Sequence, residues 1–264
     1  MIASRWIDRS AGRLLVALLV AAAAAPDAGS QPVEPGLPFA PGERCVYRGS
    51  NRLGRVGTGT MYVEGPAREA GRSTWLLRFD FNGRLGPVSV TDQTTSWFDP
   101  ATRASVRYAK RERSPVSSAT QDVRMDLAAR RWQGLNGTGG AMTTAAPLDE
   151  LSFLYVLRTL RLDDGDTYTL NRHYEPGRNP VTVRVIGRGT VRVPAGEFRT
   201  IEVELRVRDP NRYGGDGIIQ VHLTDDARRI MVRMESSVPR AGRVVLSLQS
   251  GTGGCATPGG IASR

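Results

Sequence analysis

Apolar and polar residues alternate along most of the chain, and this alternation constrains the fold more than any other feature. In residues 74–81, apolar side chains that include Trp75 and Phe79 occupy every second position, and an arginine and an aspartate lie between them. Residues 201–208 repeat the pattern with isoleucine, valine and leucine. A period of two is typical of β-strands that have one buried face and one solvated face.

The segments between the predicted strands are short and rich in turn-forming residues. Residues 98–102, 193–198 and 224–228 are examples, with Asp-Pro, Ala-Gly and Asp-Asp at their centres. Strands joined by tight turns must be antiparallel, because a parallel pair needs a long crossover. About a dozen strands do not stay flat in one open sheet. We therefore expect an all-β fold, mainly an antiparallel meander, in one domain over residues 43–250 that curls into a curved sheet, barrel or half-barrel.

One segment near the middle of the chain breaks the alternation. Residues 147–160 are apolar over most positions, begin with Pro147 and carry Asp149 and Glu150 near their start. Proline suits the first turn of a helix, and acidic residues there suit the helix dipole. We expect a helix over residues 147–160, buried against a face of the sheet and packed in or over the mouth of its curve.

Both ends of the chain differ in composition from this domain. Residues 1–30 contain arginines followed by an apolar run of about a dozen residues, which is typical of a secretory signal peptide with a cut after Ser30. The alternative is an uncleaved anchor, although the run is short for a bilayer span. Residues 31–42 are expected to be an extended leader and residues 251–264 a flexible tail. This pattern predicts a periplasmic location.

Two cysteines, Cys45 and Cys255, lie close to the two ends of the predicted domain. An even number of cysteines in an oxidising compartment favours a disulfide. Such a bond would join the first and last strands if they are neighbours. The alternative is two free thiols, because Cys255 lies in a glycine-rich segment.

The net charge is +10, and Lys110 is the lone lysine among 36 basic residues. The arginines are scattered rather than clustered, and no basic stripe with interleaved aromatic residues is found. We therefore predict no nucleic-acid binding. Weak peripheral contact with an anionic membrane surface is compatible with the charge.

The chain contains two histidines. His222 precedes Asp225 and Asp226, but the two aspartates occupy a position typical of a charged hairpin turn. His173 lies in residues 166–175, which are predicted to be a strand, so its neighbours would point to opposite faces. No serine elbow motif and no metal-ligand spacing is present. We predict a non-catalytic protein without a cofactor or a metal; the alternative is an uncharacterised hydrolase centred on His222 and Asp225.

The ordered set of four segments, in residues 96–112, 148–160, 191–205 and 218–235, resembles the bacterial exported family called domain of unknown function 3108. These segments are "SWFDPATRASVRYAKRE", "LDELSFLYVLRTL", "VRVPAGEFRTIEVEL" and "IIQVHLTDDARRIMVRME". The resemblance implies a location in the cell envelope and a β-rich fold. It supplies no catalytic residue.

These features lead to a hypothesis of binding rather than catalysis. We expect the curved sheet to hold an apolar, lipid-like ligand, with the helix covering its mouth. Trp75, Phe79, Leu154 and Tyr155 are the candidate lining residues, and the alternative for all four is ordinary core packing. A second hypothesis is a structural or assembly protein that binds another envelope protein through an exposed strand edge.

Overall fold

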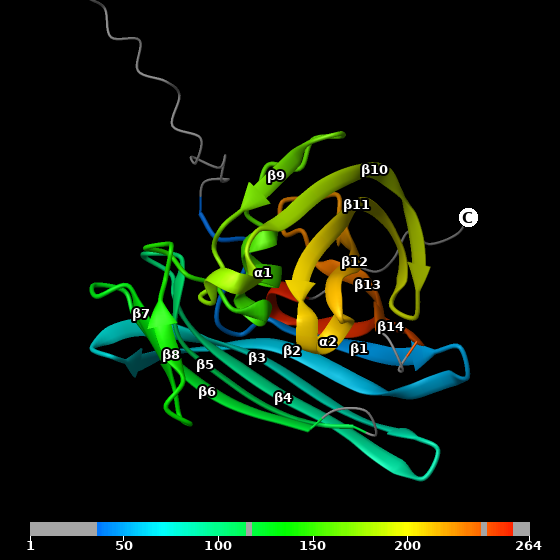
Figure 1. Ribbon diagram of the computed structural model, residues 1–264. Coiled ribbons are helices and arrows are strands. Elements are labelled where there is room, and N and C mark those ends of the chain that lie inside the picture. The colour runs from blue at the N-terminus through cyan, green and yellow to red at the C-terminus, as the bar shows by residue number, and fades with distance from the viewer. Residues whose placement is uncertain (1–35, 115–117, 239–241, 256–264) are drawn as a thin grey trace, which may run out of the picture. The chain divides into compact units, whose positions relative to one another are not determined.

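A computed structural model describes residues 36–114, 118–238 and 242–255, which form one antiparallel sheet of 14 strands (Figure 1). In chain order the elements are β1 (Arg44–Asn51), β2 (Gly54–Glu69), β3 (Arg72–Leu85), β4 (Val88–Asp99), β5 (Ala104–Arg113), β6 (Ser118–Asp126), β7 (Arg131–Gly134), β8 (Gly139–Ala141), α1 (Glu150–Leu157), β9 (Thr167–Leu170), η1 (Pro176–Arg178), β10 (Val181–Val193), β11 (Gly196–Asp209), α2 (Pro210–Tyr213), β12 (Gly215–Thr224), β13 (Met231–Val238), β14 (Gly242–Thr252) and η2 (Gly253–Cys255).

The sheet consists of two meanders that meet where β1 pairs with β14. Its order is β8-β7-β6-β5-β4-β3-β2-β1-β14-β13-β12-β11-β10-β9, and its neighbouring strands are antiparallel. The predicted antiparallel meander is therefore confirmed. The sheet does not close into a barrel, because β8 and β9 lie at its two opposite ends.

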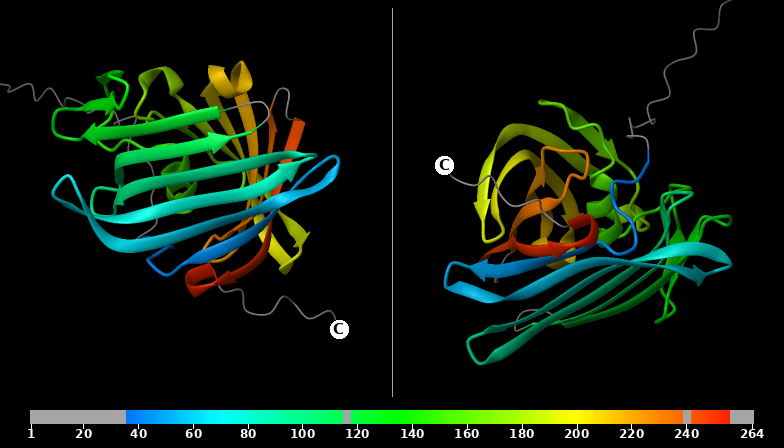
Figure 2. Two further views of the ribbon diagram at one scale, coloured as in Figure 1. Left: turned by 90° about the horizontal axis from the view of Figure 1, so that it is seen from below. Right: turned by 180° about the vertical axis from the view of Figure 1, so that it is seen from behind.

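Curvature brings the inner faces of the two meanders together. In Figure 1, strands β2–β6 form a broad layer, β10 and β11 arch above it, and α1 lies between them. The views from below and from behind in Figure 2 show the same curl. One hydrophobic cluster joins both meanders and the helix and includes Leu77, Leu157 and Val203, all with 0–1% of their surface exposed. A smaller cluster, which includes Tyr108, Met125, Met142 and Tyr174, lies beside β5–β7.

The helix α1 is buried as expected but shorter than the predicted range of residues 147–160. Asp149 is its N-cap: Oδ1 accepts hydrogen bonds from the backbone N–H groups of Leu151 (3.0 Å) and Ser152 (2.9 Å). Pro147 thus precedes the cap rather than occupying the first turn, and Arg158 is the C-cap. An aspartate side chain that satisfies the first free N–H groups sets the start of a helix more directly than a proline does. Neither helix in the described part of the chain is long and apolar enough to span a membrane.

The predicted disulfide between Cys45 and Cys255 is present. It lies where β1 runs beside the end of β14, with Cys45 opposite Gly251. The expected flexible tail, residues 251–264, therefore begins too early: residues 251–252 belong to β14, and Cys255 in η2 is fully buried. Residues 256–264 and the predicted signal peptide lie outside the described residues.

The expected leader, residues 31–42, also contributes to the core. Phe39 is 3% exposed, and its ring centroid lies 6.0 Å from that of Trp75 and 5.0 Å from that of Tyr155. Burying a phenylalanine side chain contributes about 1.5–3 kcal/mol. Phe39 therefore packs as a core residue, although the segment around it has the composition of a linker.

A buried ion pair connects this leader, β1 and the end of α1. The guanidinium of Arg158 makes two hydrogen bonds to the carboxylate of Glu43, at 2.6 Å and 2.9 Å. It also donates to the backbone carbonyls of Pro38 (2.8 Å) and Arg228 (2.9 Å). The side chains of Arg158 and Glu43 are 5% and 2% exposed. Three segments that are distant in sequence, around residues 38–43, 158 and 228, therefore converge on one charge.

Candidate functional site

The inner face of the curled sheet contains a cavity of about 190 Å³. Strands from both meanders line it, and α1 contributes one side. The cavity is not fully enclosed, so a molecule can reach it from solvent. We call it the central cavity.

Most of the wall of the central cavity is apolar. The alternation of the strands causes this, because every second side chain of β3, β11 and β12 points inward. The apolar lining residues are Met61, Phe79, Leu151, Phe153, Leu154, Val181, Leu205, Val207, Ile219, Met234 and Leu246.

Six charged residues line another part of the cavity and form what we call the polar rim. The rim consists of Asp92, Lys110, Glu150, Arg178, Arg208 and Asp209. Lys110 Nζ lies 3.3 Å from Asp92 Oδ2. Arg178 donates one hydrogen bond to Glu150 (2.6 Å) and another to Asp209 (2.6 Å). The central cavity is therefore amphipathic, with an apolar wall and a polar rim.

Electrostatics keep Glu150 ionised. Burial alone would raise the pKa of Glu150, but the positive charges of Arg178 and Lys110 outweigh burial and hold this pKa well below its usual range. Tyr108 donates a hydrogen bond to Glu150, and burial together with this carboxylate raises the pKa of Tyr108 well above its usual range. At neutral pH, Glu150 is thus an anion and Tyr108 a neutral donor.

His173 also lines the central cavity and is neutral at physiological pH. It is 7% exposed, and its Nδ1 accepts a hydrogen bond from the backbone N–H of Glu175 (3.0 Å). Burial, reinforced by the positive charge of Arg178, lowers the pKa of His173 to about 4. Its ring stacks on Tyr174 with centroids 4.6 Å apart. The prediction of a strand through residues 166–175 is wrong here, because β9 ends at Leu170 and the chain bends before His173.

The low pKa of His173 predicts a loss of stability in mild acid. In the unfolded chain His173 takes up a proton below about pH 6.5, whereas the folded protein resists protonation until about pH 4. The stability that this site contributes is present above pH 6.5 and is lost as the pH falls towards 4. We expect wild type to lose about 2–3 kcal/mol more than His173→Gln between pH 7 and pH 4.5.

Urea unfolding of both proteins at the two pH values measures this difference, and the titrations of other groups cancel in the comparison. His222→Gln is the control, because His222 is only half-buried and should give a smaller difference. Equal pH dependence of wild type and His173→Gln would contradict a neutral, buried His173.

The structure separates the four predicted lining residues into two pairs. Phe79 and Leu154 line the central cavity. Trp75 and Tyr155 do not, because Phe39 packs against both rings. The rings of Trp75 and Tyr155 therefore contact the core residue Phe39, and the leader that contains Phe39 was not predicted to be part of the core.

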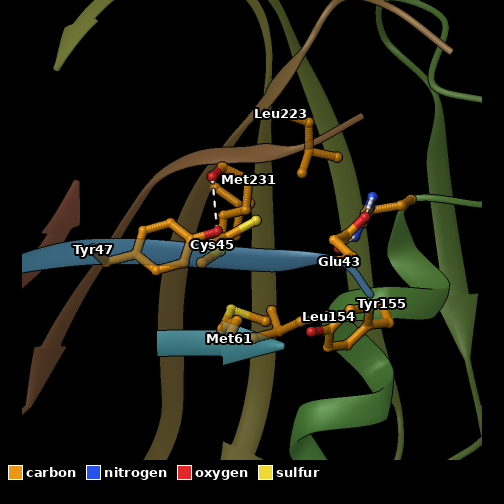
Figure 3. A pocket seen from close by; sticks show the side chains of 10 residues that line it. Glu43, Cys45, Tyr47, Met61, Leu154, Tyr155, Leu223 and Met231 are labelled. Carbon is orange, nitrogen blue, oxygen red and sulfur yellow. Dashed lines mark hydrogen bonds and ion pairs between the residues drawn. The ribbon is translucent and has the colours of Figure 1, made fainter. Parts of the chain in front are cut away.

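A second cavity lies at the other end of α1, between Glu43, Tyr47, Met61 and Met231 (Figure 3). Its volume is about 10 Å³, which is at the lower limit for a single water molecule. The Tyr47 hydroxyl donates to the Met231 carbonyl (3.0 Å), as the dashed line in Figure 3 shows. This second cavity is a packing gap and not a ligand site.

The segment around His222 forms a hairpin turn. Asp226 Oδ1 accepts hydrogen bonds from the Thr224 hydroxyl (2.7 Å) and from the N–H groups of Arg228 (3.0 Å) and Arg229 (3.1 Å). His222 lies opposite Glu202 and Arg233 in the sheet. The interpretation of the two aspartates as turn residues agrees with this geometry.

The polar rim was missed by sequence reasoning. Lys110, Glu150 and Arg178 are dispersed in sequence and resemble ordinary solvated charges. One signal was available, because a lone lysine in an arginine-rich chain is unusual. Within residues 36–114, 118–238 and 242–255, no group of three or more histidine, cysteine, aspartate or glutamate side chains is placed to hold a metal ion.

Comparison with known proteins identifies a family but no activity. A family model described as a protein of unknown function (DUF3108) matches residues 46–249. No curated protein matches the sequence. Among solved structures, a β-barrel-like protein of domain of unknown function DUF1849 from Brucella abortus aligns with a TM-score of 0.50 and 11% identity, over 82% of this chain and 97% of the other.

Two further solved structures show weaker similarity. One is from Bacteroides fragilis and is described as exported with a YmcC-like fold; it has a TM-score of 0.35 and 12% identity and covers 85% of this chain and 100% of the other. The second is from Parabacteroides distasonis and is described as a lipoprotein; it has a TM-score of 0.32 and 10% identity, over 82% and 99% of the two chains. The Brucella structure supports the curved all-β fold and carries no information on function.

Proposed function

The chain belongs to the DUF3108 family, and from its central cavity we propose that it is an exported, non-catalytic protein that binds a small amphipathic molecule. The observation that carries the proposal is a cavity of about 190 Å³ with an apolar wall and a polar rim. A concave, mainly apolar site with a few convergent polar groups is the usual form of a small-molecule site.

The volume of the cavity limits the size of the ligand. An engineered apolar cavity of about 150 Å³ holds one benzene molecule. The central cavity, at about 190 Å³, is suited to one short alkyl chain or one small ring. It is too small for several acyl chains of a whole lipid. The proposed ligand is therefore a single-chain amphipath, or one chain of a larger molecule whose remainder stays outside.

Two features support export to the periplasm. Residues 1–30 have the composition of a signal peptide. The disulfide between Cys45 and Cys255 suits an oxidising compartment.

The surroundings of His222 count against the alternative of a hydrolase centred on His222 and Asp225. In the described part of the chain, no hydrogen-bond partner lies at its Nδ1. A histidine that acts as a base needs a nucleophile within hydrogen-bond reach and a third group that orients it.

A partner protein is the second candidate, and the edge of β10 favours it. β10 is 13 residues long, but β9 pairs only with Val181–Arg184 at its start. Beyond Val185, whose N–H donates to Asp166, no described strand pairs with this edge. An extended segment of another envelope protein could add a strand there.

Calorimetric titration with 1-octanol tests the proposed function. Burying about seven methylene groups at ~0.8 kcal/mol each gives a dissociation constant on the order of 0.1 mM. We expect wild type to bind one molecule of 1-octanol. Ile219→Trp should weaken binding at least about tenfold, because Ile219 lines the central cavity and a larger side chain would fill it.

Ile218→Trp is the matched control for this experiment. Ile218 is the neighbouring residue on the opposite face of β12 and is 46% exposed. The same change at Ile218 should leave the affinity unaltered. No binding to wild type, or equal binding to the Ile219→Trp variant, would refute the proposal.

A further inference from the structure

The polar rim of the central cavity suggests which polar headgroup the ligand carries, an inference that rests on the proposed function. Each of two rim cations is held between two carboxylates. Lys110 Nζ lies 3.3 Å from Asp92 and 3.1 Å from Glu112. Arg178 lies 2.6 Å from Glu150 and 2.6 Å from Asp209. Neither cation can approach a ligand anion without weakening an existing ion pair.

The six rim residues carry equal numbers of positive and negative charges. Lys110, Arg178 and Arg208 carry three positive charges, and Asp92, Glu150 and Asp209 carry three negative charges. Glu112 lies outside the lining and adds a further negative charge beside Lys110. The side chains of Lys110, Arg178, Asp92 and Asp209 are 12–17% exposed, so solvent screens them only partly.

One more carboxylate, that of Asp149, lines the cavity, but both of its oxygens already accept hydrogen bonds from the protein. Its Oδ1 accepts the N–H groups of Leu151 and Ser152, and its Oδ2 accepts a hydrogen bond from the Ser96 hydroxyl (2.6 Å). Asp149 is fully buried. Oδ1 caps α1 and Oδ2 is held by Ser96, so we do not count Asp149 with the rim.

A charged headgroup would be disfavoured at such a rim. An ion loses its hydration on entering the cavity and needs a compensating charge there. A carboxylate would face Asp92, Glu150 and Asp209, and an ammonium group would face Arg178 and Lys110. An uncharged polar group loses much less on desolvation and can use both the donors and the acceptors of the rim.

We propose that the central cavity selects amphipaths with an uncharged polar headgroup, such as an alcohol, ester or amide, over fatty-acid anions and alkylammonium cations. The apolar wall binds the alkyl chain of the ligand, and the ion pairs of the rim bind its polar headgroup. Selectivity arises from the pairing of Lys110 and Arg178 with carboxylates. The third rim cation, Arg208, is exposed, so solvent screens its charge.

Titration of the full mature chain with three ligands of equal chain length tests this inference. The ligands are 1-octanol, octanoate and octylammonium at pH 7.5, so that only the headgroup charge changes. We expect 1-octanol to bind at least about tenfold more tightly than either ion. Octanoate or octylammonium binding as tightly as 1-octanol would overturn the inference and leave the proposed function intact. If none of the three binds, both fail.

Two variants connect the selectivity to the rim. Asp209→Asn removes one carboxylate partner of Arg178, and Asp92→Asn removes one from Lys110. Each should shift the preference towards octanoate by about tenfold while 1-octanol binding stays within about twofold, and 1-octanol binding also verifies that the variant is folded. An unchanged octanol-to-octanoate ratio in both variants would show that the rim does not set selectivity.

Discussion

Replacing Arg158 with leucine is expected to lower the free energy of unfolding by about 3–5 kcal/mol. The substitution leaves Glu43 buried at 3% exposure without its cation. It also removes the donors that satisfy the carbonyls of Pro38 and Arg228. Removing one member of a buried ion pair destabilises the folded state, because the remaining charge has neither solvent nor a partner. Chemical denaturation monitored by tryptophan fluorescence measures the loss.

Arg161→Leu is the matched control for this prediction. Arg161 lies three residues further along and pairs with Asp163 at 2.6 Å, but the two side chains are 65% and 52% exposed. Exposed ion pairs contribute roughly 0–1 kcal/mol, so the control should change little. The double change Glu43→Gln and Arg158→Leu should recover part of the loss, because no charge is then left buried. Equal effects of Arg158→Leu and Arg161→Leu would contradict the structural role of the buried pair.

Reduction of the disulfide between Cys45 and Cys255 is expected to destabilise the domain by about 2–5 kcal/mol. The two cysteines are 210 residues apart, so the bond constrains nearly the whole folded chain. Cross-linking a long loop lowers the entropy of the unfolded state, and this stabilises the folded state. It also holds the end of β14 beside β1, where the two meanders meet.

Urea unfolding of the oxidised and reduced wild type measures this effect without any change of side chain. The variant with both cysteines replaced by alanine should resemble the reduced protein, apart from a smaller loss of packing at these buried positions. Coincident unfolding curves for the oxidised and reduced wild type would contradict the prediction.

The period-two pattern was sufficient to predict the long strands and their buried faces, although it extended β9 too far, to residue 175. Leu205 and Val203 point inward on β11, as the alternation indicates. Alternation could not predict which strands are neighbours, because the pairing of β1 with β14 depends on contacts between residues about 200 positions apart. Only the cysteine pair pointed to that contact. The core role of Phe39 was hidden because the residues around it are prolines and glycines.

The candidate site was only half predictable. Phe79 and Leu154 were identified because apolar residues on an inward face are natural cavity residues. The polar rim was not identified, since its charges come from β4, β5, α1, η1 and β11, and a charged side chain is usually solvated. Arg178 and His173 became neighbours of the cavity only because the chain bends after β9, in a segment that the sequence pattern assigned to a strand.

The central claim is that a small amphipath occupies the central cavity, and methionine-methyl NMR tests it directly. Met61 and Met234 line this cavity, whereas Met125 and Met142 belong to the separate cluster beside β5–β7. In protein labelled with methyl-13C methionine and titrated with 1-octanol, we expect saturable shifts of the Met61 and Met234 signals and unchanged Met125 and Met142 signals. Unchanged Met61 and Met234 signals at saturating 1-octanol, or shifts confined to Met125 and Met142, would contradict the account.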